Sequence, residues 1–270
     1  MENISFTNSP IIIYNVDTLL YNCTFINSPI YASGFISEVT RKFQIFYSLW
    51  INSKTSPTEK HLFQANNVKD VVFHTCKFKN LRRNTPYPMV SIFRIWSLNM
   101  QNCIITNITS TFMSITESGY ATIHQTTILK SGNYFKPSVI FSVKQLHTMK
   151  ILSSVFKDIH GRTIIVEETS QLQIINNTFR NCYSEELGII TASVHKYMEI
   201  FVLFFIDSYI SNCFSRKSAN IAIQQTFLST KDVYEYRAKF GNHQNLKNQW
   251  SVKFLSCKIR HCTSESNGTV

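Results

Sequence analysis

The stretch "IINNTFRNC", residues 174–182, begins with an apolar residue, has a polar residue two places later, and continues to an aromatic residue and an Asn. The same order of residue types returns in "LYNCTFIN" (20–27), "FHTCKFKN" (73–80), "MQNCIITN" (100–107) and "FLSCKIRH" (254–261). A unit that recurs every few tens of residues is typical of repeat architectures, in which each copy is one structural element. The repeat therefore decides the fold.

Aligned as eight-residue units, the chain contains ten copies, and the sixth position of every copy is large and apolar. These residues are Phe6, Phe25, Trp50, Phe78, Ile105, Ile128, Phe156, Phe179, Ile210 and Ile259. Their spacings are 19, 25, 28, 27, 23, 28, 23, 31 and 49 residues, and all but the last suit one turn of a narrow coil of strands. The least regular unit is 45–52, where Tyr47 replaces the turn residue, and the long last spacing predicts an inserted loop at 226–250.

Most units have apolar residues at the first and sixth positions. One of these positions is odd and the other even, so in a straight strand they would point to opposite faces. A straight strand cannot bury both, because its side chains alternate between two faces. A bend at the third position resolves the conflict, since that position holds mostly Asn, Asp, Ser or Thr, which bond to nearby backbone and tolerate unusual dihedral angles. The eighth position, mostly Asn, marks the next corner. Stacked coils would turn these residues into asparagine-rich ladders.

The composition agrees with a strand-rich chain, because 44% of the residues are hydrophobic and 13% are aromatic. The repeat resembles the right-handed parallel β-helix (pectin-lyase-like fold), a solenoid in which each strand pairs with its counterpart one turn away. We therefore expect an all-β solenoid of about ten coils, with residues 1–270 as one domain. An irregular antiparallel sandwich is the alternative. Neither end has an obvious polar cap, as in a fragment of a longer solenoid.

Seven cysteines recur within the repeat. Cys23, Cys76, Cys103 and Cys257 are at the small fourth position, and Cys182, Cys213 and Cys262 directly follow the eighth. We expect buried core thiols, although Cys76 with Cys103, and Cys182 with Cys213, would lie on neighbouring coils within reach of a disulfide. No zinc-like spacing of Cys and His occurs, so we predict no metal and no cofactor.

Twenty-seven Lys and Arg residues against sixteen acids give a formal charge of +11, which favours anionic partners. The outward fifth and seventh positions carry Lys77, Lys79, Lys157, Arg180, Lys258 and Arg260. Stacked coils would arrange them as an interrupted basic stripe, suited to a linear polyanion such as an acidic glycan. The alternative is an ordinary solvated face. Thr, Ile and Leu interrupt the stripe, so nucleic acid is an unlikely partner.

Catalysis is not favoured by the sequence. Polygalacturonase-like hydrolases use paired carboxylates within N-T-D, D-D, G-H-G and R-I-K motifs, none of which occurs here. Pectate-lyase-like enzymes instead hold calcium with several acidic residues on one sheet. The nearest candidates for such ligands are Glu167 and Glu168 with Glu185 and Glu186, and the alternative is that these residues only form a solvated corner. We therefore predict no catalytic residues.

The units "CTFIN", "CKFKN" and "TFRNC" resemble repeats of polymorphic outer-membrane proteins and related surface β-helix proteins, including those of protists. The chain differs in lacking the Gly-Gly-Ala-Ile motif and in spacing F-x-N rather than F-x-x-N. The resemblance implies a non-catalytic rod of the surface, adhesion or scaffold type, with a glycan or another surface protein as partner. A carbohydrate-active enzyme (polysaccharide lyase or hydrolase) and a polyanion-binding module are the alternatives.

The compartment is not fixed by the sequence. A cell-surface or extracellular location follows only from the resemblance, because no secretory signal is visible at the N-terminus. The longest apolar run, "IFVLFFI" at 200–206, has seven residues, whereas a spanning helix needs about 20. We therefore expect this run to be core and predict no membrane span.

Overall fold

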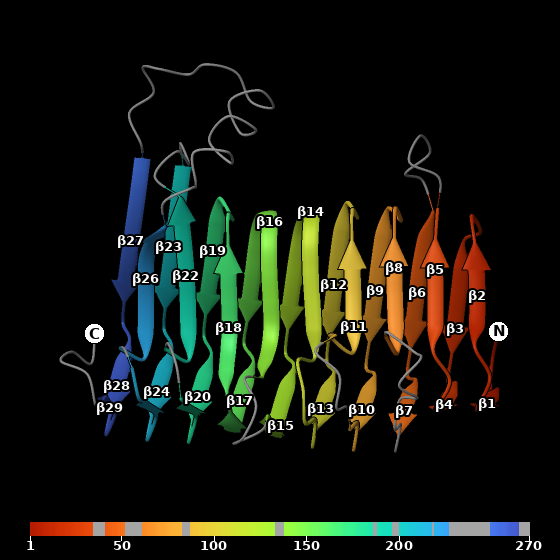
Figure 1. Ribbon diagram of the computed structural model, residues 1–270, viewed down its shortest axis with the longest axis horizontal. Coiled ribbons are helices and arrows are strands. Elements are labelled where there is room, and N and C mark those ends of the chain that lie inside the picture. Colours follow the sequence, from red (N-terminus) through yellow and green to blue (C-terminus); the bar gives the residue numbers. More distant parts are fainter. Residues whose placement is uncertain are drawn as a thin grey trace.

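The computed structural model is a parallel β-helix, and its described residues form strands, turns and bends without any helix (Figure 1). It describes residues 1–34, 41–51, 61–82, 87–132, 138–185, 188–195, 200–217, 219–226 and 249–264. Strands pair in parallel throughout, and each pairs with the strand one coil away. The all-β parallel solenoid predicted from the repeat is therefore confirmed, and the antiparallel alternative is wrong.

The first face of the solenoid is a sheet to which every aligned unit contributes one strand. Its order is β1 (Ser5–Thr7), β4 (Thr24–Ile26), β7 (Leu49–Ile51), β10 (Lys77–Lys79), β13 (Ile104–Thr106), β15 (Thr127–Gly132), β17 (Val155–His160), β20 (Thr178–Arg180), β24 (Tyr209–Ser211) and β28 (Lys258–Arg260). Beside its C-terminal end are the short strands β21 (Tyr183–Ser184), β25 (Phe214–Ser215) and β29 (Thr263–Ser264). Figure 1 shows this row running along the long axis.

A second sheet folds around the two other faces. The second face contains β2 (Ile11–Tyr14), β5 (Ile30–Ser33), β8 (Phe63–Asn66), β11 (Val90–Phe93), β18 (Arg162–Glu167), β22 (Ile190–His195) and β26 (Ile221–Thr226). The third face contains β3 (Thr18–Tyr21), β6 (Lys42–Phe46), β9 (Asp70–His74), β12 (Ser97–Gln101), β19 (Gln171–Ile175), β23 (Ile200–Ile206) and β27 (Gln249–Leu255). Two long strands, β14 (Met113–His124) and β16 (Val139–Leu152), run through both faces and join them.

Both predicted corners are present, and each consists of one residue in the left-handed backbone region. At the third position these are Asn3, Asn22, Tyr47, Thr75, Asn102, Gln125, Ser153, Asn176, Asp207 and Ser256; at the eighth they are Asn8, Asn27, Asn80, Asn107, Lys130, Asp158, Asn181, Asn212 and His261. Their φ angles lie between 48° and 56°. Asn and Asp adopt this region more easily than most residues, because their short polar side chains bond locally. Asn52 lies outside the described residues.

The predicted polar ladders form where two such residues are stacked. Asn22 Nδ2 donates to Asn3 Oδ1 at 2.7 Å, and Asn107 Nδ2 donates to Asn80 Oδ1 at 2.9 Å. Each bond joins one coil to the next along a corner. The corners therefore help to hold the coils in register.

A third corner, between the second and third faces, was not predicted. Its left-handed residues are Asn15, Asn67, Arg94, Glu117, Gln145 and Glu168. Long side chains link the coils here, as in the contact of 2.8 Å from Arg94 Nε to Glu117 Oε2 and the hydrogen bond of 3.4 Å from Arg41 Nε to Asn15 Oδ1. The coil is therefore three-sided.

The core is built from the inward columns that the alignment predicted. The described part of the unit at 45–52, residues 45–51, is regular despite Tyr47, because Trp50 is 1% exposed and stacks on Phe25 at 4.6 Å and on Phe78 at 4.7 Å between ring centroids. Stacked aromatic pairs add about 0.5–1.5 kcal/mol beyond burial. The sixth-position column is thus a continuous apolar spine.

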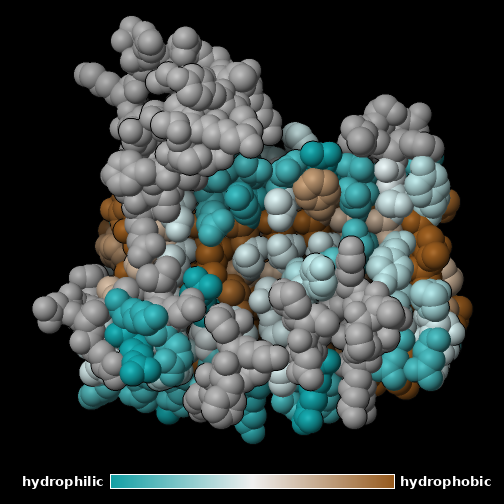
Figure 2. Space-filling view, viewed as in Figure 1, coloured by the Kyte–Doolittle hydropathy of each residue, from teal (hydrophilic) through white to brown (hydrophobic). Residues whose placement is uncertain are grey.

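The ends of the solenoid are less covered than its middle. Phe6 is half-buried and Ile259 is 37% exposed, because each has a stacked neighbour on one side only among the strands that the structure describes. In Figure 2, hydrophobic (brown) side chains show at both ends and between zones of hydrophilic (teal) ones. The inserted loop expected at 226–250 lies almost wholly outside the described residues.

Candidate functional site

The outer surface of the first face carries the six cations that the sequence singled out. They are Lys77 and Lys79 on β10, Lys157 on β17, Arg180 on β20, and Lys258 and Arg260 on β28. Strand alternation places them outward, because the residue between each pair of outward positions is in the core column. Lys77, Arg180, Lys258 and Arg260 are exposed, and Lys79 and Lys157 are half-buried.

The strand register divides these cations into two groups. β17 and β20 are neighbours, with Lys157 directly opposite Arg180. Arg180 is followed in the same column by Ser211 and then by Arg260, about 10 Å away at two coil spacings. Lys157, Arg180, Lys258 and Arg260 are named the cationic cluster. Lys77 and Lys79 stand apart, because β13 and β15 lie between them and the cluster.

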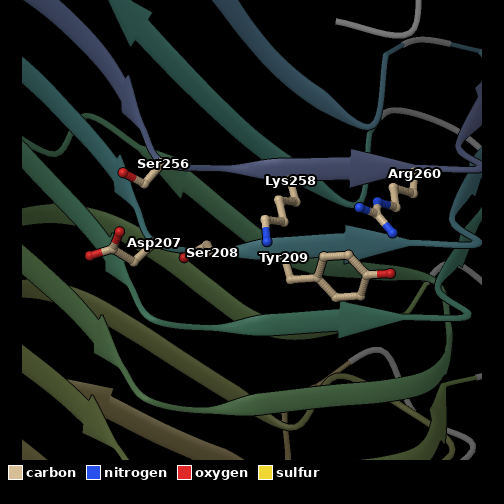
Figure 3. Close-up of a pocket in the computed structure, with 6 residues that line it drawn as sticks. All are labelled: Asp207, Ser208, Tyr209, Ser256, Lys258 and Arg260. Atoms are coloured by element: carbon tan, nitrogen blue, oxygen red, sulfur yellow. The ribbon is translucent and has the colours of Figure 1, made fainter.

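A hollow of about 580 Å³ opens at the C-terminal end of the cluster (Figure 3). It is lined by Asp207, Ser208, Tyr209, Ser256, Lys258 and Arg260. Lys258 and Arg260 extend from β28, and Tyr209 lies on the neighbouring β24. Asp207 and Ser256 are at the corner, at the end of the hollow opposite Arg260. The hollow thus combines two cations with an aromatic ring, small hydroxyl side chains and, at the end opposite Arg260, the Asp207 carboxylate.

None of the six cations forms an ion pair within the described part of the chain. The ion pairs found there involve other residues: Arg94 with Glu117, Lys144 with Glu168, and Arg216 with Glu185. The fifth and seventh positions of the strands from β1 to β28 carry no Asp or Glu at all. The fifth and seventh positions therefore carry positive charge alone, with Asp158 and Asp207 at the adjoining corners, and this charge raises the local concentration of anions within about one Debye length, ~8 Å at physiological salt.

The acidic residues considered as a calcium site lie at different ends of a strand. Glu167 ends β18, and the residue opposite it in the next coil is Ser193 of β22. Glu185 precedes β22, of which the stretch from Ile190 to Ser193 alone spans about 10 Å. These two carboxylates are therefore on adjacent coils but do not meet. Glu186 lies outside the described residues.

Glu168 and Glu185 have structural partners instead. Gln145 Nε2 donates to Glu168 Oε2 at 2.7 Å. Glu185 accepts a hydrogen bond from the Tyr183 hydroxyl and one of 3.1 Å from Arg216. The bond from Tyr183, followed by that from Arg216, lowers the pKa of Glu185. Both carboxylates thus link neighbouring side chains rather than converge on one groove.

No group of three or more His, Cys, Asp or Glu among the described residues could hold a metal ion. His74 and His124 occupy one column with Gln101 between them. Two imidazoles two coils apart, about 10 Å between backbones, cannot share one ion.

All seven cysteines are free thiols. Four of them were predicted at the inward fourth position. Of these, Cys23, Cys76 and Cys103 are buried, and Cys257 is half-buried. Burial, followed by hydrogen bonding with Cys103, raises the pKa of Cys76 well above its usual value. These thiols therefore fill the core as small apolar groups.

A row of exposed rings was missed by the sequence reasoning. Trp96 is 57% exposed and lies 5.6 Å from the Tyr120 ring, which lies 5.4 Å from His147. A Cβ on Gly119 would lie 2.5 Å from the carbonyl oxygen of Trp96, so only Gly allows the two coils to approach this closely. The alignment gave no signal for this row, because the residues fall between the repeated units.

Comparison of the chain with models of known protein families gives no match, and comparison with curated proteins gives none either. The β-helix repeat fold is thus shown by the structure itself, and the likeness to surface proteins stays a prediction. No helix among the described residues is long and apolar enough to cross a membrane.

Proposed function

We propose that this chain is a non-catalytic β-helix scaffold of the surface or adhesion type, which holds an extended anionic partner along the first face. The observation that carries the proposal is the set of outward cations without any ion pair in the described residues, on a face whose fifth and seventh positions carry no acid. The four positive charges of the cationic cluster attract a polymer whose negative charges also repeat along a line, and Lys77 and Lys79 stand apart from them on the same face.

The partner best suited to this surface is an acidic glycan. Arg forks can bind carboxylate or sulfate with two parallel hydrogen bonds, and Arg180 and Arg260 are both exposed. The ring of Tyr209, which lines the hollow together with Arg260, adds an apolar surface on which a sugar could lie. Repeated contacts along the rod would also give avidity from individually weak sites.

Binding to an array of acidic and neutral glycans at two salt concentrations tests the proposal, with release of reducing ends assayed in parallel. Salt-sensitive retention of acidic glycans without product is the expected result, because the contacts are electrostatic and exposed. Release of new reducing ends would contradict the non-catalytic assignment and would make Glu167 and Glu185 the first residues to substitute. Equal retention of neutral glycans would contradict the role of charge.

A further inference from the structure

A column of three thiols runs through consecutive coils near the C-terminal end. Cys182, Cys213 and Cys262 each follow the corner residue after the first face, and the strand register stacks them. Cys182 and Cys213 are each 1% exposed, and Cys262 is half-buried. Neighbouring coils lie ~4.8 Å apart, within the ~4.4–6.8 Å between Cα atoms that disulfides span.

The sulfur atoms of this column are close to one another. Hydrogen bonding with Cys213, followed by burial, raises the pKa of Cys262. Hydrogen bonding with Cys182 is the largest cause that raises the pKa of Cys213 to about 12. In both shifts the neighbouring thiol is the largest cause, and burial adds to it. Raised pKa values lower the thiolate fraction, so exchange at these thiols is slow and has to be followed to equilibrium.

The last pair in the column differs from the pairs inside the solenoid. A disulfide needs its Cβ atoms ~3.8 Å apart, closer than the ~4.8 Å of an ideal parallel ladder. Inner coils are held by neighbours on both sides. By contrast, among the described strands β28 pairs with β24 alone, and β29 pairs with β25 alone. These two strands can therefore move toward the coil below without breaking backbone hydrogen bonds to strands on their other side.

We propose that Cys213 and Cys262 are a thiol–disulfide site, which staples the outermost described coil to the coil below it when an external disulfide is present. The partner in the reaction is a small-molecule disulfide of the glutathione type. The staple would fix β28 and, with it, Lys258 and Arg260 of the cationic cluster. The site stands on the geometry of the thiols and does not require the proposed binding function.

The exchange proceeds in two balanced steps. The Cys262 thiolate attacks one sulfur of the external disulfide, forming a mixed disulfide and releasing one thiolate, which takes up the proton that Cys262 lost. The Cys213 thiolate then attacks the Cys262 sulfur, forming the Cys213–Cys262 bond and releasing the second small thiol, which takes up the proton from Cys213. Two protein thiols are oxidised, and one external disulfide is reduced to two thiols.

Cys262 is the entry point because it is the most accessible thiol of the column. Cys257 offers a matched control, since it is also half-buried on the same coil. In the coil below, however, the residue stacked under Cys257 is Ser208, because Lys258 pairs with Tyr209. Cys257 can therefore form a mixed disulfide but has no thiol directly beneath it to resolve that bond.

The test equilibrates the full chain with mixtures of reduced and oxidised glutathione, blocks free thiols and identifies linked peptides by mass spectrometry without reduction. We expect a Cys213–Cys262 linkage to form at a lower ratio of oxidised to reduced glutathione than any other linkage. Cys257→Ser should leave it unchanged, whereas Cys213→Ser should leave Cys262 only as a mixed disulfide. The oxidised wild-type chain should also melt at a higher temperature than the reduced chain, and Cys262→Ser should abolish this difference.

Two results would overturn the proposal. One is that Cys257 and Cys262 both stop at mixed disulfides with glutathione. The other is that Cys76–Cys103 or Cys182–Cys213 forms at a lower ratio than Cys213–Cys262, because this would remove the distinction between the outermost pair and the inner ones. Circular dichroism of each variant before oxidation shows whether its strands are intact, so loss of folding is not mistaken for loss of the site.

Discussion

Asn181 donates a hydrogen bond of 2.8 Å from its Nδ2 to Oδ1 of Asp158, the residue at the same corner one coil earlier. Both residues have a left-handed backbone, with φ of 53° and 56°. One side chain thus serves two purposes, because it tolerates the bend and also ties two coils together. This double role explains why the repeat favours Asn at its eighth position.

Replacing Asn181 separates these two roles. Asn181→Gly keeps the backbone preference and loses two hydrogen bonds, the one to Asp158 and one of 3.4 Å from Asn212 Nδ2, which should cost about 0.5–1.5 kcal/mol of unfolding free energy each. Asn181→Val loses the same bonds and also places a β-branched residue at positive φ, which should cost about 1–2 kcal/mol more. Urea unfolding of both variants measures the difference. Equal stabilities would show that the corner imposes no backbone demand.

The aromatic spine should be the most sensitive part of the core. Phe179 is fully buried and stacks on Phe156 at 4.7 Å with 9° between the ring planes. Phe179→Ala should reduce the unfolding free energy by about 3–5 kcal/mol, because it removes buried surface and leaves a cavity. Ile12→Ala is the control: Ile12 is 77% exposed, so the change should stay within about 0.5 kcal/mol. A loss of similar size in both would argue against the spine.

His160 should make stability depend on pH. Desolvation lowers the pKa of His160, and the nearby Asp158 opposes this shift in part. The unfolded chain therefore binds a proton at His160 at a higher pH than the folded chain, so stability should fall as the pH drops through and below about 6.5, the ordinary pKa of His.

The pH effect is measured by thermal unfolding between pH 5 and pH 8, together with NMR titration of the His160 ring. His160→Gln should reduce the loss of stability at the acidic end. A titration of His160 above its ordinary pKa would reverse the sign of the prediction and contradict it.

Two of the three corners were predictable because most of their residues are of types that favour turns, Asn above all. The third corner was not, because most of its residues, among them Arg94, Glu117 and Gln145, carry no turn signal. Their left-handed backbone follows from stacking on the coils before and after. Tyr47 makes the same point at a predicted corner, where the neighbouring coils impose a φ of 52° on an aromatic residue.

The outward orientation of the cations was predictable from the alternation of side chains along a strand, since each cation is next to the inward sixth residue of its unit. Their division into two groups follows from the register of β10, β17 and β20. The hollow was not predictable, because it depends on how the side chains of Tyr209, Lys258 and Arg260 extend around small Ser residues. Sequence patterns fix which face a side chain occupies but not the shape that several side chains leave between them.

The most direct test of the proposed function compares binding of dextran sulfate and of neutral dextran, two polymers with the same backbone, at low and high salt. The account predicts salt-sensitive binding of dextran sulfate alone. It also predicts that Lys157→Ala with Arg180→Ala weakens this binding about tenfold or more, while Lys77→Ala with Lys79→Ala, an equal loss of charge on the same face, weakens it far less. Equal losses in the two double variants, or binding of neutral dextran, would contradict a localised cationic site.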